Sequence, residues 1–347
     1  MIKVNNKYIG EGQPCFVVAE VGINHNGDMD LAMKSIDAAV LSGADAVKFQ
    51  NYFTEDFILD KKLTYEYTFG NKKVSETQFE MFKRNELSFE QLEKLKKHCD
   101  KKGIIFFSTP TGQRGIDDLL RLQTPLLKNG SDFLVNLEII EAMARTRLPT
   151  IISTGMATLA EIDDAVRAFE KAGGKELIIL HCISSYPTPA DEVNLLKIPA
   201  LKQAFGYSIG FSDHSEGIVA GIGSVVLGSC FIEKHFTLDK NLPGPDHSFS
   251  SDPNEFKNLV DGIRIIEKNL GQARLNPTAK EEYGRMNYRL SCVARIDLPS
   301  GHEIGKSDIA YSRPANGLPP KLAHLLHGKI LKKPLKAGDL IGFETIQ

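Results

Sequence analysis

Short apolar segments recur along most of the chain, and each ends in polar residues before a stretch with helical spacing begins. The apolar segments are residues 16–21, 44–50, 103–110, 125–131, 149–155, 176–182, 208–212 and 230–235. Near-continuous apolar runs of this length are typical of parallel strands that are buried on both faces. The stretches between them place apolar residues three or four positions apart, as amphipathic helices do. The pattern therefore predicts eight strand–helix units.

Eight such units predict a closed (β/α)8 TIM barrel over residues 1–270. A doubly wound open sheet is the alternative, but polar residues follow all eight segments instead of gathering at one switch point. Residues 271–284 are polar and lack an apolar pattern, which indicates a linker. In residues 285–347 short β-like runs alternate with turns, so we expect a small, mostly β domain there.

The amino-acid composition limits the classes of protein to which the chain could belong. The chain has 347 residues and a formal net charge of −2, and it shows no basic patch that would suit nucleic acid. It has no apolar run of about 18 residues and no apolar core of a signal peptide near its first residue. Five scattered cysteines without a CxxC pair fit a reducing compartment. We therefore expect a cytoplasmic protein with neither membrane nor nucleic-acid partners.

Two histidines follow neighbouring predicted strands. His214 and His235 are 21 residues apart, which is about the spacing that one helix between two parallel strands requires. Two imidazoles at adjacent strand ends could bind one divalent metal ion, although each could instead be an ordinary hydrogen-bonded residue. A site with so few protein ligands would leave positions open, which suits Lewis-acid catalysis on a carbonyl group. The residue types fit Mn²⁺, Zn²⁺ or Co²⁺ without choosing among them.

Lysines and hydroxyl groups gather at the same strand ends, where a barrel of this kind places its active site. They are Lys48, Thr109, Lys128, Ser131, Ser153, Ser184 and Ser212. Two point charges surrounded by small donors suit a ligand with phosphate and carboxylate groups. No Walker or dinucleotide-binding fingerprint occurs, so a nucleotide is not indicated.

Taken together, several motifs resemble those of the sialic acid synthases, also called nonulosonate synthases. They are E-V-G-I-N-H-N-G, V-K-F-Q, F-S-T-P, S-T-G-M, Y-P-T-P, G-F-S-D-H and E-K-H-F-T-L-D, in this order. The C-terminal stretch with R-P-A-N-G resembles the family's small antifreeze-like (SAF) domain. The resemblance covers the whole chain, and G-P-D-H-S is closer to the legionaminate and spore-coat members than to the pseudaminate ones.

The resemblance implies a reaction between phosphoenolpyruvate and an open-chain N-acylated hexosamine, either N-acetylmannosamine or a diacetamido-hexose. The products would be a nine-carbon 2-keto sugar acid and phosphate. It also implies a divalent metal cofactor, Mn²⁺ as the first expectation and Zn²⁺, Co²⁺ or Mg²⁺ as alternatives. The expected assembly is a domain-swapped homodimer in which Arg313 of the small domain serves the partner's site.

The resemblance assigns roles to individual residues. It implies phosphoenolpyruvate contacts at Lys48, Thr109, Lys128, Ser131, Ser153, Ser184 and Ser212. It implies sugar contacts at Gln50, Asn71, Tyr186, Asp246 and Arg313. The metal ligands would be His214 and His235, and the catalytic residues Glu20, Asp132 and His235.

Two positions depart from the family pattern. Relatives usually carry Glu or Asp two residues after the serine of K-x-x-S, where this chain has Phe133. Either Asp132 or Glu20 would then handle the proton of the attacking water, or the sugar pocket differs. Ser184 stands where many sialic acid synthases have Asn, a change that keeps a hydrogen-bond donor.

Two other functions remain as alternatives. Phe133 would also fit a catalytically weak protein that binds a sugar or an anion on the same scaffold. A metal-dependent pyruvate aldolase is the other alternative, but two lysines within a ring of hydroxyls suit a phosphate better than a bare keto acid.

Overall fold

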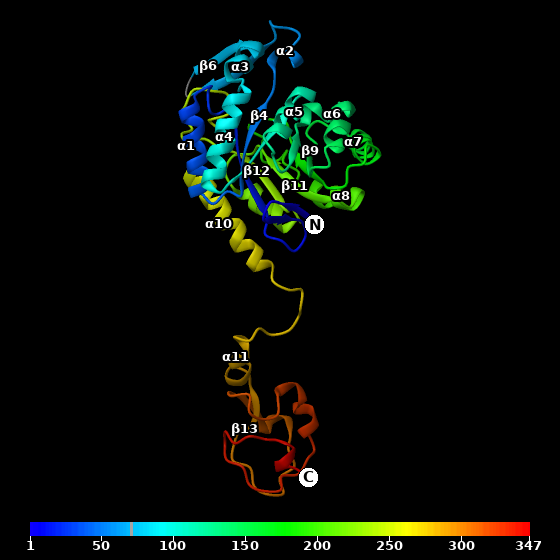
Figure 1. Ribbon diagram of the computed structural model, residues 1–347. Helices are drawn as coiled ribbons and strands as arrows, with labels where there is room; N and C mark the ends of the chain where they lie inside the picture. The colour runs from blue at the N-terminus through cyan, green and yellow to red at the C-terminus, as the bar shows by residue number, and fades with distance from the viewer. Residues whose placement is uncertain (70–71) are drawn as a thin grey trace. The chain divides into compact units, whose positions relative to one another are not determined.

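The chain folds into two compact units, Met1–Gly271 and Gln272–Gln347. Figure 1 shows the computed structural model, which describes residues 1–69 and 72–347. Asn71, which the sequence places at the sugar site, lies outside the described residues. In the described part of the chain, no helix is long and apolar enough to cross a membrane.

The first unit is built on one sheet of eight parallel strands. The strands are β3 (Phe16–Gly22), β4 (Ala46–Asn51), β7 (Ile105–Pro110), β8 (Leu127–Asn129), β9 (Thr150–Ser153), β10 (Leu177–Cys182), β11 (Ser208–Asp213) and β12 (Phe231–His235). They hydrogen-bond in the order β7-β4-β3-β12-β11-β10-β9-β8, and the end strands β7 and β8 contact each other. The sheet therefore closes on itself, which confirms the predicted barrel and excludes the open sheet.

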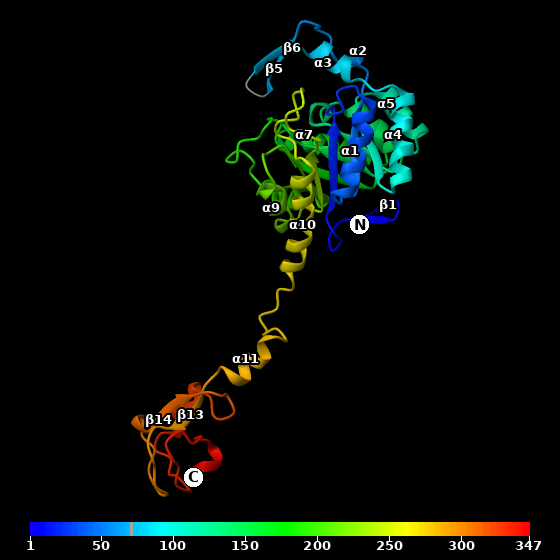
Figure 2. The same cartoon turned by 90° about the vertical axis from the view of Figure 1, so that its left-hand side faces the viewer.

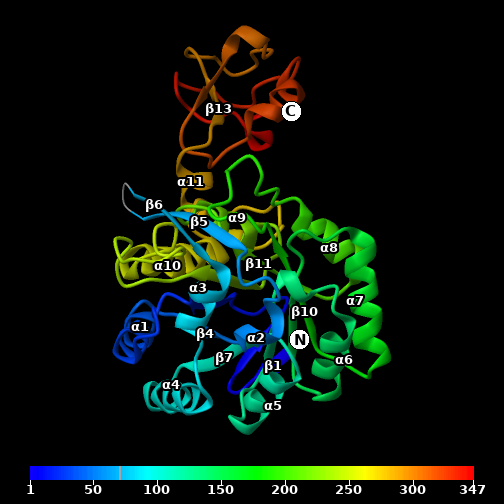
Figure 3. The ribbon, with the colours of Figure 1, turned by 90° about the horizontal axis from the view of Figure 1, so that it is seen from above.

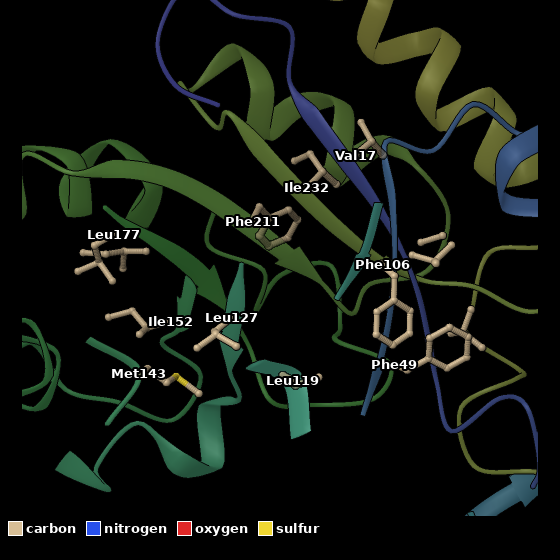
Figure 4. Close-up of a cluster of buried hydrophobic side chains, with 14 of the residues drawn as sticks. Val17, Phe49, Phe106, Leu119, Leu127, Met143, Ile152, Leu177, Phe211 and Ile232 are labelled. Carbon is tan, nitrogen blue, oxygen red and sulfur yellow. The ribbon is translucent and has the colours of Figure 1, made fainter. Parts of the chain in front are cut away.

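Helices surround this sheet (Figure 3). They are α1 (Met29–Leu41), α4 (Phe89–Lys102), α5 (Gln113–Arg121), α6 (Leu137–Arg145), α7 (Leu159–Lys171), α8 (Lys197–Phe205), α9 (Val219–Val226) and α10 (Pro253–Leu270). Local sequence sets where several begin: Ser88, Thr158 and Asp252 each form a capping box with the residue three positions later. Outward-facing strand residues such as Val17, Phe106 and Ile232 form the core that these helices cover (Figure 4).

A second apolar cluster packs the amino-terminal end of the barrel. Phe16 and Phe231 stack inside it with ring centroids 5.5 Å apart, next to Phe107. The hairpin of β1 (Ile2–Val4) and β2 (Lys7–Ile9) adds its apolar side chains to the same cluster. The inside of the barrel is therefore filled with side chains at this end.

An insertion follows β4 and interrupts the strand–helix alternation. It contains α2 (Thr54–Phe57), the antiparallel pair β5 (Thr64–Phe69) and β6 (Lys72–Thr77), and α3 (Gln78–Asn85). Figure 2 shows these elements beyond the end of the barrel that is opposite β1. The insertion therefore lies at the carboxyl ends of the strands.

The second unit has a small core of its own, which includes Cys292, Ile304, Leu326 and Ile341. Its regular elements are α11 (Glu281–Asn287), the antiparallel pair β13 (Ser291–Ala294) and β14 (Ile309–Ser312), and the 3₁₀ helices η2 (Lys306–Asp308), η3 (Pro320–Leu326) and η4 (Phe343–Thr345). Short strands joined by turns agree with the predicted small β domain. Helix α11 begins within the stretch that the sequence indicates as a linker.

Candidate active site

The carboxyl ends of the barrel strands surround a cavity of about 550 Å³. Most of the residues predicted from the sequence line it together: Glu20, Lys48, Gln50, Thr109, Lys128, Ser131, Asp132, Ser153, Tyr186, Ser212, His214, His235 and Asp246. A cavity of this size can hold two small substrates side by side. The structure therefore brings these residues together at the carboxyl ends of the strands, where the rule for barrels expects an active site.

Two of the predicted site residues that the structure describes are not among those lining the cavity. Ser184 lies just beside it, because its Oγ and that of Ser131 would both contact a Cβ placed on Gly155. Arg313 belongs to the second unit, where its guanidinium lies 5.5 Å from the ring centroid of Tyr288. Asn71 lies outside the described residues, so its position is not assigned.

Four buried charged side chains form the floor of the cavity. The Nζ of Lys48 is 2.8 Å from Glu20 Oε1 and 3.7 Å from Glu233 Oε1, and the Nζ of Lys128 is 3.9 Å from the same oxygen of Glu233. We call these four residues the charged cluster. Glu20 Oε2 and Glu233 Oε2 have no hydrogen-bond partner among the described residues. The cluster thus contains two positive and two negative groups. One oxygen of each carboxylate remains able to accept a hydrogen bond.

Burial and mutual contact move the pKa values within the charged cluster. Burial raises the pKa of Glu20 to about 7, against the opposing effect of Lys48. Burial would also raise the pKa of Glu233, but Lys128 and Lys48 outweigh it and keep that pKa below its ordinary value. Burial lowers the pKa of Lys128, whereas at Lys48 the two carboxylates overcome burial and raise the pKa. Glu20 is therefore the member that can gain or lose a proton near neutral pH.

Hydroxyl groups extend the charged cluster into a ring of donors. Lys48 donates to Thr109 Oγ1 at 3.1 Å, and Lys128 donates to Ser153 Oγ at 2.7 Å. Ser212 donates to Glu233 at 3.2 Å. Each lysine is thus hydrogen-bonded to a hydroxyl on the next strand. The lysines and the hydroxyls could both donate hydrogen bonds to an anion that enters the cavity.

The two histidines lie side by side with ring centroids 5.4 Å apart. The Nδ1 of His214 donates to the carbonyl of Ile183 at 2.8 Å, which leaves Nε2 as the nitrogen that could bind a ligand. Burial opposes a charge on this ring, but Cys182 and the Ile183 carbonyl outweigh burial and raise the pKa of His214. The Nδ1 of His235 is buried without a hydrogen-bond partner among the described residues and lies 3.8 Å from Asp246 Oδ2. Burial, and then the neighbouring His214, hold the pKa of His235 well below its ordinary value, so its ring is neutral.

These donors fit a divalent cation. Neutral imidazoles are common ligands of Mn²⁺, Zn²⁺ and Co²⁺, and an unpartnered buried ring nitrogen is costly unless something binds it. Within the described residues no group of three or more His, Cys, Asp or Glu side chains is arranged to hold a metal. The pair would therefore leave most coordination positions to water or substrate, as the sequence suggested.

A second buried ion pair lies behind the histidines. Asp213 and Lys234 are partners in the β11–β12 register and directly precede the two histidines. The Nζ of Lys234 is 3.0 Å from Asp213 Oδ2, and both side chains are almost fully buried. Ser215 donates its backbone N–H and its hydroxyl to Asp213 Oδ1, at 2.9 and 2.6 Å. Side chains alternate along a strand, so this pair points away from the cavity and ties together the two strand ends that carry the histidines.

Sequence reasoning assigned no role to several lining residues. Glu233 is two positions before His235 on the same strand, so the period of two places it on the cavity side. The thiol of Cys182 also lines the cavity, with its Sγ 3.7 Å from His214 Nδ1. Aromatic side chains of the insertion line the outer part of the cavity: Tyr52, Phe57, Tyr65 and Phe82. The aromatic composition of the insertion hinted at a functional surface, but no periodic pattern indicates which rings face inward.

We predict that Asp213→Asn lowers the free energy of unfolding by about 3–5 kcal/mol, because it leaves the buried Lys234 without its charge partner. Replacing both residues, as Asp213→Leu with Lys234→Met, should recover most of this loss, since two apolar groups need no partner. Urea denaturation measures both effects. The control is Asp261→Asn, which breaks the exposed Lys257–Asp261 pair on α10 and should cost less than about 1 kcal/mol. An equally small loss for Asp213→Asn would contradict the role given to the buried pair.

Comparison with known proteins agrees with this site. A family model described as the NeuB family matches residues 35–274, and the SAF domain model matches residues 291–347. N,N'-diacetyllegionaminic acid synthase of Legionella pneumophila is 39% identical over 350 residues, which cover 99% of this chain and 98% of the relative. N-acetylneuraminate-9-phosphate synthase of Homo sapiens is 31% identical over 343 residues, 98% of this chain and 95% of the relative.

A solved structure gives the same result. The crystal structure of N-acetylneuraminic acid (sialic acid) synthetase from Leptospira borgpetersenii superposes with a TM-score of 0.74 and 36% identity, over 81% of this chain and 94% of that one. The resemblance drawn from the motifs is therefore confirmed. The chain belongs to the NeuB family of sugar-acid synthases and carries a SAF domain at its C-terminal end.

Proposed function

We propose that this chain joins phosphoenolpyruvate to the open-chain aldehyde of an N-acylated hexosamine, N-acetylmannosamine or a diacetamido-hexose. The products are a nine-carbon 2-keto sugar acid and inorganic phosphate. One observation carries the proposal: a single cavity combines two lysines ringed by hydroxyls with a pair of adjacent histidines. Relatives named as synthases of N,N'-diacetyllegionaminic acid, pseudaminic acid and N-acetylneuraminate 9-phosphate support this class of product.

Phosphoenolpyruvate would bind at the charged cluster. Lys48 and Lys128 supply two positive charges for its phosphate and carboxylate, and buried lysines interact with anions far more strongly than lysines in water do. The hydroxyls of Thr109, Ser131, Ser153, Ser184 and Ser212 are the matching small donors. Glu20 and Glu233 hold the lysines in place before the ligand arrives.

The sugar aldehyde would lie beside His214 and His235. A divalent cation held by these two imidazoles, Mn²⁺ first and Zn²⁺, Co²⁺ or Mg²⁺ as alternatives, would supply Lewis-acid polarisation of the carbonyl group. Gln50, Tyr186 and Asp246 line the same part of the cavity and can hydrogen-bond sugar hydroxyls. We keep Asn71 as a further sugar contact on the resemblance alone.

The proton of the attacking water goes to Glu20 in this proposal. The enol carbon of phosphoenolpyruvate forms the new bond to the aldehyde carbon, water adds at C2, and phosphate leaves as the 2-keto group forms. A base with a pKa close to the working pH is well suited to take the proton from that water. Glu20 has a pKa of about 7 and a free Oε2 in the cavity, whereas Asp132 lies exposed on η1 (Ser131–Phe133). These observations favour Glu20 over Asp132.

We further propose a cytoplasmic, domain-swapped homodimer in which Arg313 completes the sugar site of the partner subunit. The support is the family resemblance of S-R-P-A-N-G, together with five free cysteines that fit a reducing compartment. A closed two-fold dimer would give each barrel one small domain.

Phosphate release from phosphoenolpyruvate, measured with and without an N-acylated hexosamine, tests the proposed function. We expect release that depends on the sugar, falls to background after chelation and returns with Mn²⁺. His235→Ala should lower turnover by at least about 100-fold with an unchanged circular dichroism spectrum, because a rim residue contributes little to the core.

Two other outcomes would contradict the synthase. Binding of both substrates without phosphate release would indicate a catalytically weak binding protein. A lysine adduct trapped by borohydride with pyruvate would support an aldolase that forms a Schiff base at a lysine instead of using the metal, and the lowered pKa of Lys128 favours that chemistry.

Subunit complementation tests the proposed assembly. Arg313→Ala and His235→Ala proteins, each inactive alone, are mixed under conditions that allow subunits to exchange. In a swapped dimer one site of each mixed pair is intact, so roughly a quarter of the wild-type activity should return. If Arg313 serves its own barrel, every site keeps one defect and mixing restores nothing.

A further inference from the structure

The motif N-H-N-G forms a tight turn shortly after β3, at the carboxyl ends of the strands; we call residues 24–27 the asparagine turn. Asn26 and Gly27 have left-handed backbone angles, with φ of 51° and 74°, and asparagine is one of the few side chains that tolerate this conformation. The backbone N–H of Asn26 donates to the carbonyl of Ile23 at 3.0 Å, and that of Gly27 donates to His25 Nδ1 at 3.0 Å. The turn is thus fixed by its own hydrogen bonds. Neither Asn24 nor Asn26 is among the residues that line the cavity.

The segment that follows β12 needs outside contacts to hold its shape. Residues 238–250, which we call the β12 loop, are all described and contain no helix or strand. The loop returns to its strand at Ser251, whose N–H donates to the carbonyl of His235 at 2.8 Å. In between it brings Asp246 Oδ2 to 3.8 Å from His235 Nδ1, and it brings the ring centroid of Phe249 to 5.2 Å from that of His235. The position of this loop therefore decides what surrounds His235.

Both asparagines of the turn donate hydrogen bonds to the β12 loop. Asn24 Nδ2 donates to Ser250 Oγ at 2.9 Å, and Ser250 Oγ in turn donates to the carbonyl of Asp246 at 2.6 Å. Asn26 Nδ2 donates to the carbonyl of Pro243 at 2.8 Å. The asparagine turn thus holds the loop on both sides of Asp246.

A buried histidine adds a third connection. His247 is 1% exposed, and burial lowers its pKa to about 4, so its ring is neutral and carries one proton. Asn26 uses its Nδ2 on a carbonyl, so its Oδ1 faces His247 Nε2, 3.4 Å away. The one proton then lies on Nε2, and Nδ1 accepts from the hydroxyl of Thr237 at 2.7 Å. His247 therefore links the asparagine turn to the chain just beyond His235.

The arrangement has a cost that an apolar side chain would avoid. Asn24 is 2% exposed, and its Oδ1 is buried without a hydrogen-bond partner among the described residues. An unpartnered buried oxygen lowers stability, and such exceptions are expected where function requires them. What Asn24 contributes is therefore the pair of hydrogen bonds that it donates, one to Ser250 and one to the carbonyl of Phe236 at 2.9 Å.

We propose that Asn24 and Asn26 are positioning residues for the reaction: they hold the β12 loop so that the carboxylate of Asp246 stays beside His235. They act through Asp246 and touch no substrate themselves. The inference rests on the proposed function, in which Asp246 hydrogen-bonds the sugar and His235 holds the cation. It gives a role to the part of G-I-N-H-N-G that the proposed function leaves unused.

Asn26→Gly tests the inference, because glycine keeps the left-handed backbone and removes both hydrogen bonds of the amide. Asp246 would then be less well placed, so KM for the N-acylated hexosamine should rise about 10-fold. Phosphoenolpyruvate binds at the charged cluster in the proposed function, so its KM should stay within about twofold of the wild-type value. A general loss of folded protein would instead lower kcat and leave both KM values unchanged. Asn26→Asp keeps an acceptor for His247 and should give a smaller rise.

Hydrogen–deuterium exchange gives a second readout that does not depend on turnover. The amides of residues 238–250 should exchange at least about 10-fold faster in Asn26→Gly than in the wild-type protein, because the loop loses two of its contacts. Asn194→Gly is the matched control. Asn194 also has a φ of 51° and donates its Nδ2 to a backbone carbonyl, that of Glu192 at 2.7 Å, but it is not among the residues that line the cavity. This variant should change neither the kinetics nor the exchange of the β12 loop.

The outcomes separate this inference from the proposed function. If the wild-type protein releases no phosphate with any N-acylated hexosamine, the proposed function is wrong. The exchange data then decide alone: faster exchange of the β12 loop supports the positioning of Asp246, and unchanged exchange overturns it. If the protein is active, an unchanged KM for the sugar or an equal rise in both KM values overturns the positioning role. Asn24→Ala should repeat the result of Asn26→Gly, and because Asn26 is only half-buried, its variant keeps the test available if Asn24→Ala does not fold.

Discussion

The site depends on one constraint: charges taken out of water must find partners. The charged cluster places Lys48, Lys128, Glu20 and Glu233 within one buried region, where an isolated ion would be costly. Each lysine has a carboxylate within 4 Å, so the cluster can exist without a ligand. The compensation is incomplete, because both carboxylates keep an unpartnered oxygen and burial has pushed the pKa of Glu20 to about 7. In the proposed reaction an anion would therefore bind the two lysines, while Glu20 stays ionised to take the proton of the attacking water.

The barrel fold places these paired charges around one cavity. Parallel strands bring residues from distant parts of the chain to one rim, and their alternation separates two layers of side chains. Glu233 and His235 face the cavity, while Lys234 points outward and pairs with Asp213 behind it. Aromatic side chains from outside this frame, those of Tyr52, Phe57, Tyr65 and Phe82 in the insertion, also line the cavity.

Much of the fold could be predicted from the sequence, because eight apolar segments of similar length are a strong signal that does not depend on any single contact. The rim position of Lys48, Lys128 and the two histidines followed from the same regularity. The charged cluster could not be foreseen as a unit, since the distances between Glu20, Lys48 and Glu233 depend on how neighbouring strands are staggered. No role was assigned to Glu233, although its place two residues before His235 puts it on the cavity side of the strand. The aromatic side chains of the insertion that line the cavity were missed because an insertion without periodicity gives no information on which side chains face inward.

The central claim is that Glu20 is ionised in the substrate complex and takes the proton of the attacking water. The pH profile of kcat/KM for phosphate release, measured on the wild-type protein and on Glu20→Gln, tests it most directly. A base with a pKa of about 7 should make the wild-type value fall about tenfold for each pH unit below that pKa. Glu20→Gln should be much slower and should lack this part of the pH dependence. The same dependence in both proteins would contradict the claim.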